Sequence, residues 1–281
     1  MSWTNKYWDA VEQLYWTPKY LGLKSISKKY WEVSGDRVSV PKEMTNPNGP
    51  LYRRVTTGKE FSKLVRHHEE TFNHIFELTF GILDGEIINQ IFCQLLRESH
   101  QDRLKGYGRE LGLEFGFPKL YDISQPDSFF VGNNWTIAVE LKFDAKTSMD
   151  QLAKYLLALT LEREQNSGRK PVHLVYIAPE PEKLLKDAFP FETANVGSHQ
   201  LARILAESKQ SVVAPLLEME ATASSVLDDL AISAVSWREL DQVLHDLAMG
   251  FSRNNPEART VNNLLLGLLE EIRLHPASGL K

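Results

Sequence analysis

The stretch 125–155 limits the possible fold of this chain more than any other part of the sequence. It holds two short segments rich in apolar residues, 128–131 and 135–143, which have the composition of β-strands. The residues Gly-Asn-Asn at 132–134 separate them, and such residues are typical of a tight hairpin turn. The stretch therefore predicts two antiparallel strands that lie side by side.

The segments around this hairpin alternate between helical and strand patterns. Ser148 is a suitable N-cap for the helical pattern after it, and the apolar segment 171–178 then predicts a buried strand. Further helices are expected at 58–80, 84–100, 149–164, 181–189, 199–208, 238–250 and 256–274, and further strands at 119–123 and 230–237. This order predicts an α/β fold with a mixed central β-sheet flanked by helices.

The composition is that of a globular chain with room for a sizeable core, because 42% of the 281 residues are hydrophobic and 25% are charged. The N-terminal segment lacks the apolar core of a signal peptide, and no run of apolar residues has the length of a membrane span. Cys93 is the single cysteine, so a disulfide within the chain is impossible. We therefore expect a cytoplasmic protein that does not contact the membrane. The net charge of -5 is too mild to indicate nucleic acid, although such binding needs only a local basic face.

Residues 1–60 differ in character from residues 61–281, which we expect to form the main domain. The first segment holds four of the six tryptophans, and it has ten Lys and Arg against six Asp and Glu. It is either an arm that docks on the main domain or a lobe that stacks on bases and binds phosphates. In the second case the residues expected to bind nucleic acid are Lys24, Lys28, Lys29, Arg53 and Arg54. The aromatic residues could instead mediate a homodimer or bind a partner protein.

Charged residues stand at the open end of the predicted hairpin. Asp127 opens its first strand and Glu140 lies near the end of the second, so the hairpin brings the two carboxylates together. Lys142 is two residues beyond Glu140, and both side chains therefore point to the same face of the sheet. A hard divalent cation such as Mg²⁺ neutralises converging carboxylates, polarises a phosphodiester and lowers the pKa of a bound water. Lys142 can then orient that water or stabilise charge on the phosphorus.

These residues resemble the PD-(D/E)XK nuclease superfamily. Pro126-Asp127 and Glu140-Leu141-Lys142 occupy the positions of its motif. Gln151 and Tyr155 match the Q-x-x-x-Y element of the RecB-like branch, and their spacing of four residues puts both on one face of a helix. The resemblance implies a restriction-endonuclease-like core in which this glutamine and tyrosine help to position the substrate or the catalytic lysine.

The resemblance also implies a set of metal ligands. Asp127 and Glu140 would hold Mg²⁺, for which Mn²⁺ can substitute in vitro, and the carbonyl of Leu141 would be a third ligand. Members of the family often add a glutamate from the first core helix. From its position we expect Glu86 to take that place, with Glu77 as the second choice.

Taken together, the motif predicts a metal-dependent nuclease that hydrolyses phosphodiester bonds of nucleic acid, with DNA as the first choice of substrate. Lys146, just past the motif, either contacts a substrate phosphate or is solvated. Free-standing members of the family often act in defence or in mobile elements, and a role of that kind with partner proteins is expected. The alternative is a catalytically silent nucleic-acid-binding or scaffold subunit that retains the nuclease fold. The motif leaves open DNA or RNA, and endonuclease or exonuclease action.

Overall fold

The structure is a computed structural model that describes residues 69–107, 126–143, 146–166, 168–251 and 256–280. The helices are α5 (Glu69–Ile82), α6 (Gly85–Leu96), α8 (Met149–Asn166), α9 (Pro181–Ala188), α10 (Leu201–Ala206), α11 (Gln210–Glu218), α12 (Glu220–Asp228), α13 (Trp237–Gly250) and α14 (Pro256–Leu274), with a short 3-10 helix η3 (Ser198–Gln200). The strands are β1 (Lys105–Tyr107), β2 (Ser128–Val131), β3 (Thr136–Leu141), β4 (Val172–Ala178) and β5 (Leu230–Ser236).

The strands form one mixed sheet in the order β1-β2-β3-β4-β5. β2 pairs antiparallel with β1 and with β3, whereas β3, β4 and β5 run parallel. Parallel neighbours need a crossover connection, and α8 supplies it between β3 and β4. The carboxyl ends of the three parallel strands therefore lie at one edge of the sheet, together with the start of β2.

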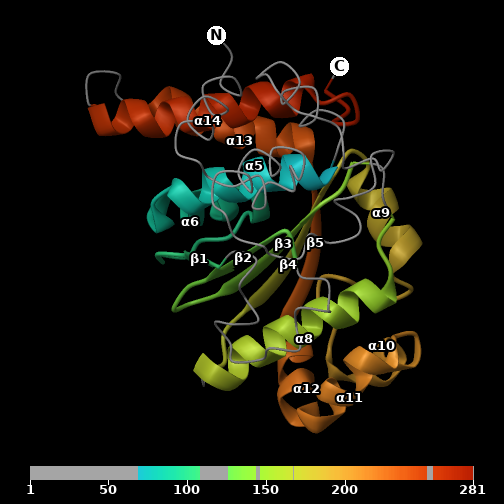
Figure 1. Cartoon of the computed structure of the whole chain (residues 1–281). Coiled ribbons are helices and arrows are strands. Elements are labelled where there is room, and N and C mark those ends of the chain that lie inside the picture. The colour runs from blue at the N-terminus through green and yellow to red at the C-terminus, as the bar shows by residue number, and fades with distance from the viewer. Residues whose placement is uncertain (1–68, 108–125, 144–145, 167, 252–255, 281) are drawn as a thin grey trace, which may run out of the picture.

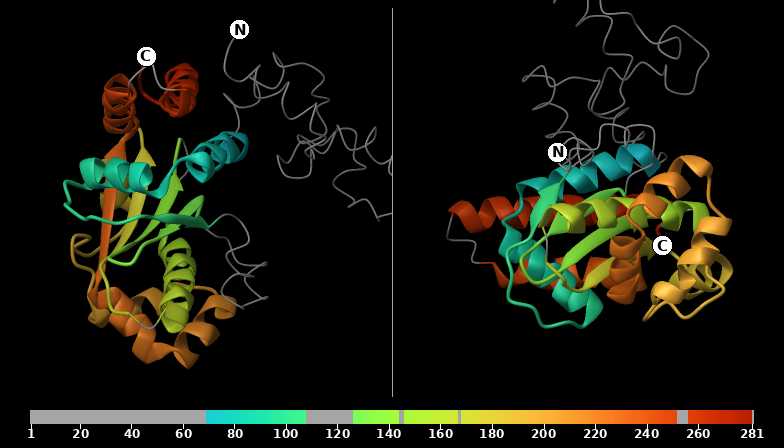
Figure 2. Two further views of the ribbon diagram at one scale, coloured as in Figure 1. Left: turned by 90° about the vertical axis from the view of Figure 1, so that its left-hand side faces the viewer. Right: turned by 90° about the horizontal axis from the view of Figure 1, so that it is seen from below.

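Helices cover both faces of the sheet. α5, α6, α13 and α14 lie on one face, and α8 with α10, α11 and α12 lies on the other (Figures 1 and 2). Each face has its own apolar core, because alternate residues of a strand point to opposite sides. On β3, Ile137 and Val139 belong to the first core and Ala138 to the second. Polar groups at the even-numbered positions of β3 therefore face α8.

The predicted α/β class, with a mixed sheet flanked by helices, is confirmed, and this arrangement is consistent with a restriction-endonuclease-like core. The sequence did not predict β1, α11 or α12. β1 has three residues, one of them glycine, and only its pairing with β2 makes it a strand. The predicted strand at 119–123 lies outside the described residues, as does the whole of the segment 1–60.

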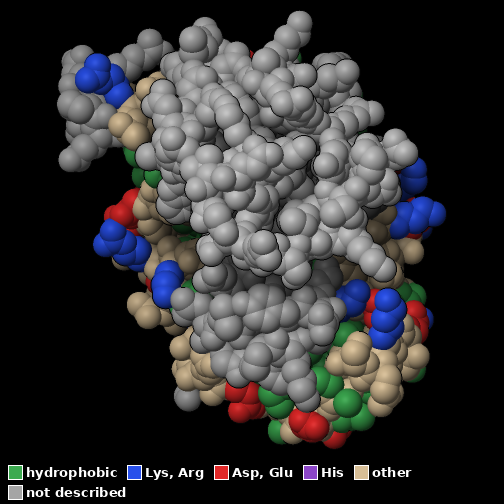
Figure 3. All heavy atoms as spheres, viewed as in Figure 1, with side chains coloured by type: hydrophobic (Ala, Val, Ile, Leu, Met, Phe, Trp, Pro, Cys, Tyr) green, Lys and Arg blue, Asp and Glu red, His purple; other side chains and the backbone are tan. Residues whose placement is uncertain are grey.

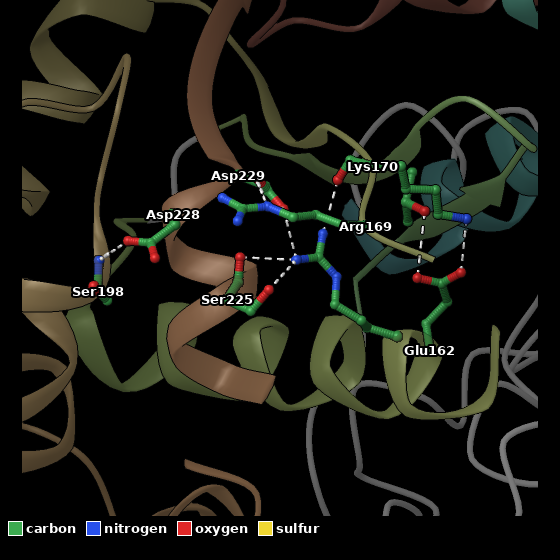
Figure 4. A network of polar contacts seen from close by, with 9 residues as sticks. Glu162, Arg169, Lys170, Ser198, Ser225, Asp228 and Asp229 are labelled. Atoms are coloured by element: carbon green, nitrogen blue, oxygen red, sulfur yellow. Dashed lines mark hydrogen bonds and ion pairs between the residues drawn. The ribbon is translucent and has the colours of Figure 1, made fainter. Parts of the chain in front are cut away.

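A buried network of charges stabilises the edge of the sheet where the hairpin turns (Figure 4). Arg163 of α8 donates to Asp229, which immediately precedes β5, at 2.8 Å. The ammonium of Lys170 lies 2.9 Å from the carboxylate of Glu162 and 2.9 Å from the carbonyl of Gly132 in the turn. The end of α8 is thereby tied to the turn and to the residues that precede β4 and β5. The start of α8 therefore lies at the other end of the strands, beside the carboxyl ends of β3, β4 and β5.

The described residues carry charges of both signs on the surface seen in Figure 3. In the view of Figure 3, Lys and Arg side chains lie beside Asp and Glu side chains along both flanks of the described residues, so the visible charge there is mixed. Among the residues that the structure describes, no helix is both long and apolar enough to cross a membrane.

Candidate active site

The open end of the hairpin is held together by the side chain of Asp127. The pairing of Ser128 with Val139 places Asp127 and Glu140 at the next position of the two strands. The Asp127 carboxylate accepts the backbone N–H of Leu141 at 2.8 Å through one oxygen. Its other oxygen accepts the side-chain amide of Asn73, from α5, at 2.6 Å. The carboxylate thus connects the end of β3 to the helix layer above the sheet.

Glu140 and Lys142 form a buried ion pair at the end of β3. Their side chains are 6% and 7% exposed, and the Lys142 ammonium lies 2.6 Å from Glu140 Oε1. Because the two residues are separated by one position of the strand, both side chains face α8. The sheet therefore presents a carboxylate and an ammonium in direct contact in a desolvated environment. Burial of this kind strengthens each electrostatic interaction in the site.

The first turn of α8 supplies the remaining contacts of Glu140. Gln151 Nε2 donates to Glu140 Oε1 at 2.7 Å and also to the phenol oxygen of Tyr155. Tyr155 is fully buried, and this burial, followed by the negative charge of Glu140, raises the pKa of Tyr155 well above its usual value. The charge of Asp127 contributes in the same direction. The field of both carboxylates thus reaches the Tyr155 hydroxyl, which remains protonated and hydrogen-bonds to Glu140.

The backbone of Lys142 is held from both sides. Its N–H donates to the carbonyl of Ile177 on β4 at 2.8 Å, and its carbonyl accepts the indole N–H of Trp237 at 3.0 Å. The next residue, Phe143, is stacked between Trp237 and His275, with ring centroids 4.5 Å and 3.6 Å away. Trp237 thus holds the main chain that carries the lysine.

The structure brings together five of the residues that the sequence singled out. These are Asp127, Glu140, Lys142, Gln151 and Tyr155. Leu141 is also in place, because its N–H contacts Asp127. Lys146 is exposed and directly precedes Thr147, whereas the basic residues of the segment 1–60 lie outside the described residues.

Glu86 is not brought to this end of the sheet. It is exposed in the first turn of α6, where its backbone N–H donates to Asp84. The start of α6 contacts Leu104, and the neighbouring Asp102 accepts from the N–H groups of the hairpin turn. Glu86 therefore lies beside the turn, at the opposite edge of the sheet from Asp127. The structure therefore does not bring Glu86 together with the other predicted ligands, because α5 and not α6 reaches the open end of the hairpin.

Sequence reasoning missed three polar residues of the site: Asn73, Thr147 and Tyr176. Asn73 interrupts the apolar positions of its helix, and this interruption is visible in the sequence. In the structure Asn73 is 7% exposed. Thr147 donates to Gln151 Oε1 at 3.0 Å and lies 3.1 Å from the hydroxyl of Tyr176. Nothing in the local sequence distinguishes Tyr176 from an ordinary strand residue.

The donors present fit a hard divalent cation in their chemistry. Two carboxylates, Asp127 and Glu140, converge at the end of one hairpin, and Mg²⁺ is typically bound by one or two carboxylates with several waters. No group of three or more His, Cys, Asp or Glu side chains able to hold a metal occurs within the described residues. A metal here would therefore depend on the two carboxylates, on backbone carbonyls and on water.

Comparison of the chain with protein-family models, with curated proteins and with solved structures finds no match. A functional conclusion for this protein therefore depends on the residues of the site and on the contacts between them.

Proposed function

We propose that the protein is a metal-dependent nuclease of the PD-(D/E)XK type that hydrolyses phosphodiester bonds of DNA. One observation carries the proposal. Asp127, Glu140 and Lys142 meet at one end of a hairpin, and the Q-x-x-x-Y pair of α8 contacts Glu140 directly. A solvated surface hairpin would leave these side chains in water, whereas Glu140 and Lys142 are almost fully buried.

The residues of the chain have distinct roles in this proposal. Asp127 and Glu140 would hold Mg²⁺, with the Leu141 carbonyl as a third ligand, and the bound metal would polarise the phosphodiester and acidify a water. Lys142 keeps its ammonium beside Glu140, where it orients the attacking water by hydrogen bonding and stabilises negative charge that develops on the phosphate oxygens. Gln151 and Tyr155 hold Glu140 in place.

Lys146 is proposed to contact a substrate phosphate, because it is exposed and lies close in sequence to both the motif and α8. A role in defence or in mobile elements, with a partner protein or as a homodimer, belongs to the same proposal.

A second candidate function has one observation in its favour. Both oxygens of Asp127 and one oxygen of Glu140 accept hydrogen bonds from groups of the protein itself. The two negative charges are thereby partly compensated within the chain, as they would be in a silent scaffold that retains the nuclease fold. Cation binding separates the two candidates, because a scaffold of this kind has no need for it.

The deciding experiment is cleavage of plasmid and single-stranded DNA by the whole chain in Mg²⁺, in Mn²⁺ and in EDTA, beside Glu140→Gln. Glu98→Gln is the matched control, since Glu98 pairs with His100 near the other end of the sheet. We expect cutting that requires metal, is abolished in Glu140→Gln and is unchanged in Glu98→Gln. Cutting that persists in EDTA, or in Glu140→Gln, would refute the assignment. Absence of cutting together with absence of Mn²⁺ binding would support the scaffold.

A further inference from the structure

We propose that Tyr176 and Thr147 are positioning residues that determine which end of the Gln151 side-chain amide faces Glu140. The inference rests on the proposed function in one respect, namely that Glu140 is the carboxylate that holds the metal. It adds to that function a series of hydrogen bonds, called the relay below, which joins Tyr176, Thr147, Gln151 and Glu140 in that order. In the relay each side chain donates a hydrogen bond to the next.

The relay consists of polar groups from β3, β4 and α8 together with Thr147, which precedes α8. Tyr176 is the partner of Glu140 in the register of β3 and β4, so the two side chains lie next to each other on the face covered by α8. The Tyr176 hydroxyl lies 3.1 Å from Thr147 Oγ1, which in turn lies 3.0 Å from Gln151 Oε1. The amide nitrogen of Gln151 contacts Glu140 at 2.7 Å. Tyr176 is 0% exposed, Glu140 4% and Thr147 8%, whereas Gln151 is partly exposed, so water has least access to the contact between Tyr176 and Thr147.

Which group donates in each hydrogen bond of the relay follows from the number of hydroxyl protons that Tyr176 and Thr147 possess. Within the described part of the chain, Thr147 is the one hydrogen-bond partner of the Tyr176 hydroxyl. A buried phenol proton needs an acceptor, and Tyr176 therefore donates to Thr147 Oγ1. A threonine hydroxyl has a single proton, which Thr147 then donates to Gln151 Oε1. The oxygen end of the amide is thereby directed to Thr147 and the nitrogen end to Glu140.

The opposite orientation of the amide would be unfavourable at both ends. A glutamine amide has nearly the same shape when its oxygen and nitrogen are exchanged, so packing alone does not select one orientation. In the exchanged state, Gln151 Oε1 would face the negative oxygen of Glu140, and Glu140 would lose a donor. One buried hydroxyl proton, that of Thr147 or that of Tyr176, would also lose its acceptor, because Thr147 Oγ1 would then face an amide donor in place of the amide oxygen. Leaving buried polar groups unsatisfied in this way is costly.

The phenol at the start of the relay keeps its proton at any ordinary pH. Burial is the main cause that raises the pKa of Tyr176 far above its usual value, and the charge of Glu140 acts in the same direction. A partly ionised phenol could accept from Thr147 and would reverse the relay. Because its pKa is raised, the phenol stays protonated under conditions in which a nuclease works, and the relay keeps its direction there.

The test is a double-mutant cycle read by calorimetric binding of Mn²⁺ to the whole chain. Thr147→Val and Tyr176→Phe remove one hydroxyl each with little change of shape, and Thr147→Ser retains it. We expect Thr147→Val to weaken Mn²⁺ binding by about tenfold, as is typical for a residue that orients a ligand through a hydrogen bond. Thr147→Ser should stay within about twofold of the parent, because serine supplies the same donor and acceptor.

The cycle distinguishes positioning from a general structural role. In a Gln151→Met background the relay has no amide to orient, so Thr147→Val should there change Mn²⁺ binding by less than about twofold. Thr160→Val is the matched control, since Thr160 is also a buried threonine but lies within α8, where it donates to the carbonyl of Leu156. It should leave Mn²⁺ binding unchanged in both backgrounds.

The binding results can overturn the relay in two ways when the parent protein binds Mn²⁺. Equal losses from Thr147→Val with and without Gln151, or wild-type binding in Thr147→Val, would overturn the relay and leave the metal site intact. If the parent binds no Mn²⁺, the proposed function is wrong, and the relay is then judged from melting temperatures in EDTA. There the losses from Thr147→Val and Gln151→Met should be smaller together than their sum. Strictly additive losses would overturn the relay in that case as well.

Discussion

Replacing Lys142 by methionine tests the central feature of the site, the buried ion pair. The Lys142 ammonium lies 2.6 Å from Glu140 Oε1, and the two side chains are 7% and 6% exposed. Methionine keeps most of the apolar stem of lysine and removes the charge. The variant therefore leaves the carboxylate of Glu140 buried without the ammonium that now compensates it.

The size of the effect follows from the contacts that remain. Removal of one partner from a buried ion pair destabilises a protein by about 3–5 kcal/mol. Gln151 Nε2 still donates to Glu140, and a hydrogen bond to a charged group contributes about 1.5–3 kcal/mol. We therefore expect Lys142→Met to lower the free energy of unfolding by about 2–4 kcal/mol. For a chain of this length, that corresponds to a melting temperature lower by roughly 3–7 °C.

The assay is urea unfolding at neutral pH, first in EDTA and then in Mg²⁺. Because a bound cation can take over the compensation of Glu140, we expect Mg²⁺ to stabilise Lys142→Met more than it stabilises the parent. The double variant Glu140→Gln with Lys142→Met should be more stable than Lys142→Met alone, since it has no buried charge to compensate. Neither variant should cleave DNA.

Lys183→Met is the matched control. Lys183 also lies 2.8 Å from a glutamate, Glu180, but both side chains are more than two-thirds exposed. Its loss should therefore leave the free energy of unfolding close to that of the parent. If Lys142→Met is no more destabilising than this control, the pair is not desolvated and our account of the site is wrong. Full cleavage by Lys142→Met would refute the role of the lysine.

Three further predictions concern other residues. Asn73→Ala removes the amide donor of Asp127, and we expect Mn²⁺ affinity measured by calorimetry to fall about tenfold; unchanged affinity would mean that α5 does not belong to the site. Because the pKa of Tyr155 is raised in the folded state, the stability that this group contributes is present below about pH 10 and is lost as pH rises towards the folded pKa. Unfolding at pH 10.5 should therefore increase phenolate absorbance less in Tyr155→Phe than in the parent, and equal increases would contradict the shift. Asp229→Asn weakens the network at the far edge of the sheet, and it should lower the melting temperature without changing Mn²⁺ affinity, whereas a change in affinity would show that the two edges are coupled.

Much of the site was predictable because its geometry is local. The hairpin that brings Asp127 and Glu140 together is encoded by its turn residues and by the lengths of its two strands. The spacing of two residues puts Glu140 and Lys142 on one face of a strand, and the spacing of four puts Gln151 and Tyr155 on one face of a helix. These relations follow from the backbone periods alone. They hold wherever the elements lie in the fold.

The partner of Asp127 from the helix layer could not be predicted in the same way. Glu86 and Asn73 are both on helices that precede the hairpin, and a glutamate is the more obvious metal ligand. Which helix reaches the open end of the sheet depends on how α5 and α6 pack against its face, and this packing is decided by contacts between residues far apart in sequence. In the structure the helix residue that contacts Asp127 is Asn73.

The sequence by itself determined the chemistry available at the open end of the hairpin, because residue spacing and backbone period place two carboxylates and a lysine there. Only the tertiary structure decided how these groups are held. Tyr176 reaches Thr147 because β4 pairs with β3 in one register, and Trp237 reaches the Lys142 carbonyl because α13 begins directly after β5. Strand register and helix packing result from the burial of the whole core, so no short segment of the chain contains them.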